Sequence, residues 1–147
     1  MSRGLAVVMV ALAGGFVGLQ APINARLGRQ VGSLQAATVS FMVGTIALLA
    51  IAALSSGGLS PISNVGKVPW WALIGGLLVA FYVTVALITV RTLGASALTA
   101  LVVAGQLSVA VAIDRFGLFG IAKQHIAAPR ILGLVLLLAG VVLVVRK

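Results

Sequence analysis

Five polar side chains lie inside or at the ends of long apolar segments, and they are the residues best able to contact a small molecule. They are Gln20, Asn24, Tyr82, Thr99 and Gln106. Gln106 is the strongest candidate, because it lies in the middle of an apolar segment beside Gly105, where a helix can flex. An amide at membrane depth needs a hydrogen-bond partner or water. Two interpretations stay open: contact with a ligand, or a hydrogen bond that only joins two helices.

The chain holds too few reactive side chains for an enzyme. It has no cysteine, one histidine (His125) and one carboxylate (Asp114). These cannot form a metal cluster, a catalytic triad or a pair of carboxylates. We therefore predict no catalytic residue, no metal and no cofactor. Asp114 is expected to form a local ion pair with its neighbour Arg115 or to contact lipid headgroups.

The composition requires a membrane around these residues. Of the 147 residues, 62% are hydrophobic and 7% are charged, with a mean hydropathy of +1.29, whereas about a quarter of a soluble domain is charged. A helix needs about 20 largely apolar residues to cross the hydrocarbon core. We predict an all-α membrane protein, one transmembrane bundle spanning 1–147. Its five helices cover approximately 5–21, 34–54, 70–90, 95–113 and 131–145.

The basic residues fit a membrane protein better than a nucleic-acid-binding protein. The formal net charge is +9, but the ten Lys and Arg residues are scattered singly between apolar runs. A nucleic-acid-binding surface would gather them on one face, whereas single basic residues between helices contact anionic lipid headgroups. Trp70 and Trp71 follow Pro69 and are predicted to anchor the third helix at the membrane interface.

The basic residues also bear on topology. Five helices place successive loops on alternate sides, and each side then receives five Lys or Arg residues. Orientation is normally set by an excess of these residues on the cytoplasmic side. The balance favours dual topology, in which copies insert both ways and pair as an antiparallel homodimer, or pair with an oppositely oriented paralogue as a heterodimer. A fixed topology with one misassigned loop stays open.

The final apolar segment carries a pattern of small residues suited to helix association. Helices in lipid associate through close backbone approach. Gly133 and Gly140 lie seven residues apart and so share one helix face, and Val141 follows the second glycine. Packing within one bundle is the simpler interpretation of the remaining small-residue stripes.

From about residue 72 onward, the sequence resembles the core of the drug/metabolite transporter superfamily. The stretches 81–94, 95–114 and 129–141 are similar to the second, third and fourth helices of small multidrug-resistance proteins. The resemblance implies an EamA-like half-transporter bundle with a flexible helix near Gly105. It also implies a dimer seam at Gly133, Gly140 and Val141. With the stretch 22–28 and five helices, the whole chain is most similar to a family of bacterial inner-membrane exporters.

One departure from the small multidrug-resistance proteins affects the mechanism. Those proteins carry a membrane-embedded glutamate in the first helix, and the matching position here falls near Gly14 and Gly15. The resemblance therefore implies a dimeric exporter of metabolites or drugs acting by alternating access, with a neutral or anionic substrate or a different form of coupling. A passive ion channel of dual topology and a non-transporting or lipid-translocase subunit are the alternatives.

Overall fold

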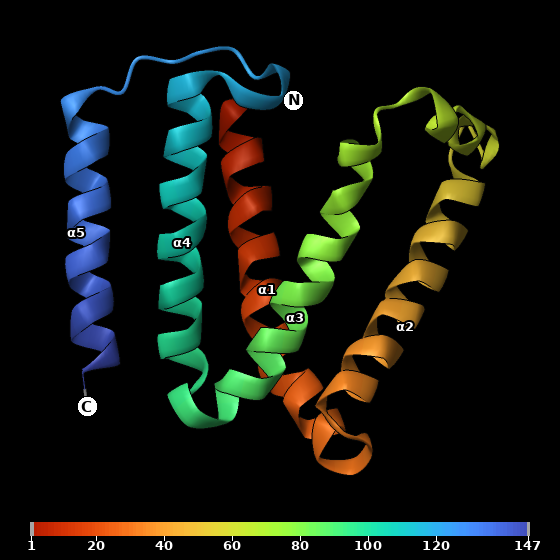
Figure 1. Ribbon diagram of the computed structural model, residues 1–147, viewed down its shortest axis with the longest axis horizontal. Helices are drawn as coiled ribbons and strands as arrows, with labels where there is room; N and C mark the ends of the chain where they lie inside the picture. The colour runs from red at the N-terminus through yellow and green to blue at the C-terminus, as the bar shows by residue number, and fades with distance from the viewer. Residues whose placement is uncertain (1, 147) are drawn as a thin grey trace. The chain divides into compact units, whose positions relative to one another are not determined.

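Long α-helices make up most of the computed structural model, which describes residues 2–146 (Figure 1). The long helices are α1 (Arg3–Val31), α2 (Ser33–Leu54), α3 (Ile74–Leu93), α4 (Ala95–Phe116) and α5 (Ala128–Val145). Short 3-10 helices cover Ser60–Lys67, Trp70–Leu73 and Leu118–Gly120. Each of the five spans, the third counted from Trp70, is long and apolar enough to cross a membrane. The predicted all-α membrane fold is confirmed, and no strand occurs within residues 2–146.

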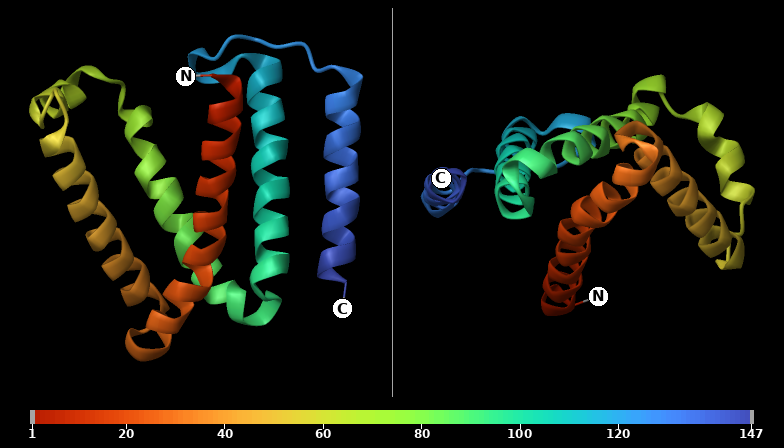
Figure 2. Two further views of the ribbon diagram at one scale, coloured as in Figure 1. Left: turned by 180° about the vertical axis from the view of Figure 1, so that it is seen from behind. Right: turned by 90° about the horizontal axis from the view of Figure 1, so that it is seen from below.

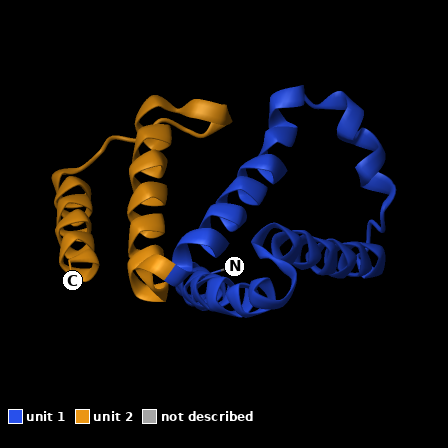
Figure 3. Cartoon of the chain, turned by 60° about the horizontal axis from the view of Figure 1, so that its bottom comes forward, with its two compact units in different colours: residues 1–91 blue, residues 92–147 orange. Residues whose placement is uncertain are grey.

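The chain divides into two compact units, Met1–Arg91 and Thr92–Lys147 (Figure 3). Unit 1 contains α1, α2 and α3, and unit 2 contains α4 and α5. The single bundle expected from the sequence stays a prediction. Each unit is described by itself below.

Helix α1 is longer than the sequence indicated. The first helix was predicted over approximately 5–21, but residues 22–31 are also helical, and the link to α2 is Gly32 alone. Pro22 removes one backbone donor and bends a helix without ending it, and α1 changes direction in its C-terminal third (Figures 1 and 2). Gly32 has a φ of 93°, a conformation that suits glycine. The turn is therefore tight, and α1 and α2 diverge from their joined ends (Figure 2).

The core of unit 1 is small and lies near this turn. It consists of Ala36 and Ala37 from α2 and Val83 and Leu87 from α3. Leu87 is 1% exposed, and Leu27, Phe41 and Tyr82 pack around the cluster. The small side chains of the two alanines leave room for Val83 and Leu87 of α3 at this contact.

In unit 2, α4 packs against α5, and an ion pair spans the connection between them. The side chain of Asp114 near the end of α4 accepts a hydrogen bond from the guanidinium of Arg130 in the first turn of α5. The prediction that Asp114 pairs with Arg115 is therefore wrong. Adjacent residues of a helix point about 100° apart, so the side chain of Arg115 points away from that of Asp114. The backbone N–H of Gln124 also donates to the Asp114 carbonyl over 2.8 Å. Asp114 thus contacts Gln124 within the segment 117–127 and Arg130 just after it.

Most large apolar side chains are exposed in the isolated chain, which is the surface that a membrane protein presents to lipid or to a partner. Trp70 is 75% exposed and Trp71 is 46% exposed, at the start of the third span. Their predicted role as interfacial anchors stays a prediction.

Candidate functional site

The most unusual polar residue of unit 1 is Asn24, which lies in α1 two residues after the proline. Its side chain is only 6% exposed. The Ser40 hydroxyl of α2 donates a hydrogen bond to Asn24 Oδ1 over 2.8 Å. Asn24 Nδ2 has no hydrogen-bond partner among residues 2–146. Because leaving a buried donor unsatisfied costs about 1–3 kcal/mol, this amide is a candidate contact for water or a ligand.

A small cavity of about 10 Å³ lies beside this amide. Such a volume holds roughly one water molecule. The cavity is lined by Gln20, Ala21, Asn24, Tyr82, Val83, Ala86 and Leu87. The structure therefore brings together three of the five polar residues singled out from the sequence. Gln20 is exposed, whereas Tyr82 is half-buried against the core.

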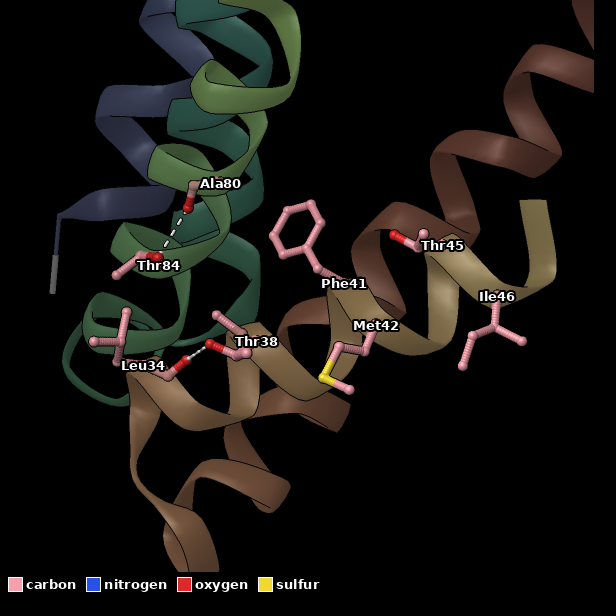
Figure 4. A pocket seen from close by; sticks show the side chains of 9 residues that line it. Leu34, Thr38, Phe41, Met42, Thr45, Ile46, Ala80 and Thr84 are labelled. Carbon is pink, nitrogen blue, oxygen red and sulfur yellow. Dashed lines mark hydrogen bonds between the residues drawn. The ribbon is translucent and has the colours of Figure 1, made fainter. Parts of the chain in front are cut away.

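A larger pocket of about 490 Å³ lies between α2 and α3. Its lining residues are Leu34, Ala37, Thr38, Phe41, Met42, Thr45, Ile46, Ala80 and Thr84. Figure 4 shows the Phe41 ring projecting from α2 toward α3. The hydroxyls of Thr38 and Thr84 donate to carbonyls of their own helices, Leu34 O over 3.0 Å and Ala80 O over 2.8 Å (Figure 4). The pocket wall is therefore largely apolar.

A third pocket of about 230 Å³ shares lining residues with each of the other two. It is lined by Gln20, Ser40, Phe41, Gly44, Thr45 and Leu48. Gln20 also lines the small cavity at Asn24, whereas Phe41 and Thr45 also line the large pocket. The three spaces are therefore neighbours, and only the small cavity is lined by Asn24.

The charges of unit 1 are all positive, because residues 1–91 contain no Asp or Glu. Arg91, at the end of α3, reaches α1 and donates from Nη2 to the carbonyl of Ala25 over 3.2 Å. This places a guanidinium beside the residue that follows Asn24. Arg91 lines none of the three pockets, so the site offers the Asn24 donor with a guanidinium nearby, and residues 1–91 supply no carboxylate for a cation.

The other two polar candidates, Thr99 and Gln106, are both exposed on α4 in unit 2. A Cβ on the neighbouring Gly105 would meet no atom within 4 Å. Their predicted substrate contacts, like the flexibility of α4 at Gly105, stay predictions.

The predicted dimer seam lies on α5. A Cβ on Gly133 or Gly140 would meet no atom within 4 Å, so the space beside both glycines is open in the single chain. Val141 is 7% exposed and is buried within its own chain. The seam stays a prediction.

Sequence reasoning missed Ser40, Phe41 and Thr45 as members of the site. Ser40 belongs to a stripe of small residues on α2, which reads as helix packing. Its hydrogen bond to Asn24 joins two residues that lie sixteen positions apart in sequence, on two different helices. The periodicity of a single helix cannot predict such a contact. The signal available in the sequence was Asn24 itself, whose buried amide implies a partner on a neighbouring helix.

Comparisons with known proteins identify the family. A family model described as "Putative inner membrane exporter, YdcZ" matches residues 5–143. The chain is also 28% identical to "Inner membrane protein YdcZ" of Escherichia coli (strain K12) over 148 residues, covering 100% of this chain and 99% of that protein. No solved structure matches it. The chain belongs to this family of inner-membrane exporters, so the predicted drug/metabolite transporter family and the multi-pass inner-membrane location are confirmed.

Proposed function

We propose that this inner-membrane exporter moves small molecules through the neighbouring pockets of unit 1 by alternating access, and that it acts as a dimer. The observation that carries the proposal is the unsatisfied Nδ2 of Asn24, a residue that is 6% exposed and lines a small cavity next to a larger pocket. A buried polar group that lacks a protein partner is a typical contact for a substrate in a membrane-embedded site.

The hinge-like geometry of α1 supports alternating access. Pro22 bends α1 two residues before Asn24, and Gly32 ends it in a turn of one residue. Broken or bent helices beside a midplane site are common in transporters, because the bend lets one segment move while its neighbour stays packed. A change of the bend at Pro22 would alter how Asn24 meets the pockets.

Two independent features support the dimer. The basic residues are balanced between the two sides of the membrane, which suits copies of opposite orientation. Helix α5 presents open space beside Gly133 and Gly140, where another helix can approach closely. Either an antiparallel homodimer or a pairing with a paralogue satisfies both features.

The test is a flux assay on the full chain in proteoliposomes. Vesicles are loaded with a metabolite mixture, and the efflux of each compound is measured by mass spectrometry against protein-free vesicles. Alternating access predicts saturable efflux of particular compounds and accelerated exchange when the same compound is present outside. Passive conductance without saturation would instead support a channel, and no efflux of any compound would contradict transport by this chain alone.

Two variants then separate the candidate sites. Gln20→Ala changes a residue shared by two pockets of unit 1, whereas Gln106→Ala changes the exposed amide of α4. A pathway through unit 1 predicts that Gln20→Ala changes the saturation constant of efflux. If Gln106→Ala leaves flux unchanged, its predicted substrate contact is wrong.

A further inference from the structure

The Asn24 amide offers a donor and has its acceptor already occupied. Ser40 Oγ donates to Oδ1, whereas Nδ2 keeps its N–H groups unused within residues 2–146. We propose that the site recognises a hydrogen-bond-accepting oxygen on an otherwise apolar small molecule, so that the exporter takes neutral or anionic amphiphiles rather than cations. This inference rests on the proposed transport function and specifies its substrate class.

The shape of the pockets fits the apolar part of such a molecule. The pocket between α2 and α3 has a volume of about 490 Å³, within the range of roughly 300–1,000 Å³ that small-molecule sites have. The hydroxyls of Thr38 and Thr84 donate hydrogen bonds to backbone carbonyls of their own helices. Their protons are therefore not offered to a ligand in the pocket. An apolar body is therefore stabilised there by burial.

The charges of unit 1 disfavour a cationic head. A buried cation needs a carboxylate or several oxygen ligands to replace its hydration. Residues 1–91 contain no carboxylate, and Arg91 donates to the carbonyl of Ala25, next to Asn24. An anionic or neutral oxygen would meet the Asn24 donor with no carboxylate of residues 1–91 to repel it and with the Arg91 guanidinium nearby, although Arg91 lines none of the three pockets.

A matched set of probes tests this preference directly. Phenylacetamide, phenylacetate and 2-phenylethylammonium share one aromatic body and differ in the head. Binding is measured by isothermal titration calorimetry on the purified full chain in detergent micelles, with protein-free micelles as the blank. We expect saturable binding of the amide and the carboxylate, and binding of the ammonium weaker by roughly tenfold or more, since one hydrogen bond to a charged or buried partner is worth about that factor.

Substitution of Asn24 assigns the preference to this residue. Asn24→Leu removes the donor and should weaken both oxygen-bearing probes by roughly tenfold. Asn24→Asp is nearly the same size, keeps an acceptor for Ser40 and replaces the donor by a carboxylate, so it should reject phenylacetate and gain affinity for the ammonium. Val79→Leu, on the exposed part of α3 away from the pocket linings, is the control and should bind as the wild type does.

Three results would overturn the inference: equal or tighter binding of the ammonium by the wild type, unchanged selectivity in Asn24→Asp, or no saturable binding of either oxygen-bearing probe. Failure of Asn24→Leu to fold leaves the Asn24→Asp measurement to decide. The readout is binding rather than flux. Selective binding without efflux would therefore contradict only the transport function, and efflux of cations alone would contradict only the substrate class.

Discussion

The guanidinium of Arg91 lies against Gly28, with Nη2 3.4 Å from the position that a Cβ on Gly28 would take. The same nitrogen donates to the Ala25 carbonyl over 3.2 Å. This contact ties the end of α3 to the part of α1 that follows Pro22, across 66 positions of sequence. Because Asn24 lies in this part of α1, Arg91 helps to set the position of the candidate site.

Substitutions of Gly28 should therefore depend strongly on size. Its other neighbours would be Ser33 Cα at 3.5 Å and Ala36 Cβ at 3.6 Å, which are ordinary contact distances. Gly28→Ala should fold normally and gain up to about 1 kcal/mol, because alanine loses less backbone entropy in a helix than glycine. Gly28→Leu should displace Arg91 and lower the melting temperature in detergent. Equal melting temperatures for the two variants would contradict the close contact.

The number and nature of the helices were predictable because hydropathy acts over whole segments. Runs such as 131–145 need no tertiary information to be assigned to the membrane. The end of α1 was not predictable in the same way. Pro22 and the glycines at 28 and 32 are ordinary stop signals, but the segment stays helical with Gly28 and Asn24 packed in the interior of unit 1.

The site was only partly predictable. The sequence shows which polar residues lie in apolar segments, but it does not show which of them contact each other. Asn24, Gln20 and Tyr82 were on that list, and the structure places them around one cavity. The pairing of Asn24 with Ser40 depends on the tight turn at Gly32. Likewise, Asp114 was assigned its sequence neighbour rather than Arg130, because helix direction and loop return decide which cation it meets.

The Asp114–Arg130 ion pair should be measurable by a double-mutant cycle. The two side chains are 19% and 36% exposed, respectively, so solvent screens part of the attraction. Asp114→Asn, Arg130→Gln and the double variant should give a coupling free energy of about 1 kcal/mol in urea or thermal unfolding. Hydrogen exchange of the segment 117–127 should rise in each single variant. A coupling of zero would mean that the backbone bond from Gln124 alone holds this segment.

Filling the large pocket should block transport without unfolding the protein. Ala80 lines the pocket between α2 and α3, whereas its neighbour Val79 is exposed and is not among the lining residues. Ala80→Phe places a ring in the space and should reduce efflux by about tenfold or more through steric exclusion. Val79→Phe adds a similar ring on the outer face and should retain wild-type efflux. Equal losses would place the pathway elsewhere.

The association of two copies should depend on the small residues of α5. Gly133→Leu and Gly140→Leu each add a side chain where the single chain leaves open space, so they should prevent close helix approach. Single-molecule photobleaching in lipid vesicles should then report one step instead of two. Gly14→Leu on α1, where the space is also open, is the matched control and should leave two steps. If both α5 variants still bleached in two steps, the predicted dimer interface on α5 would be wrong.

The orientation of the chain should respond to a single added charge. The sequence has no cysteine, so Ser33→Cys and Asn64→Cys each create a unique labelling site without removing a charge. Ser33 begins α2, and Asn64 lies in the loop beyond the other end of α2. Dual topology predicts that an impermeant thiol reagent labels part of each population from either side of the membrane. Because the basic residues are balanced, one added lysine should favour one orientation. Ser63→Lys should increase the fraction of copies with the loop 55–69 in the cytoplasm, and Gln30→Lys should increase the fraction with the α1–α2 turn in the cytoplasm. Labelling of each site from one side only, unmoved by either lysine, would establish a fixed topology and exclude the antiparallel homodimer.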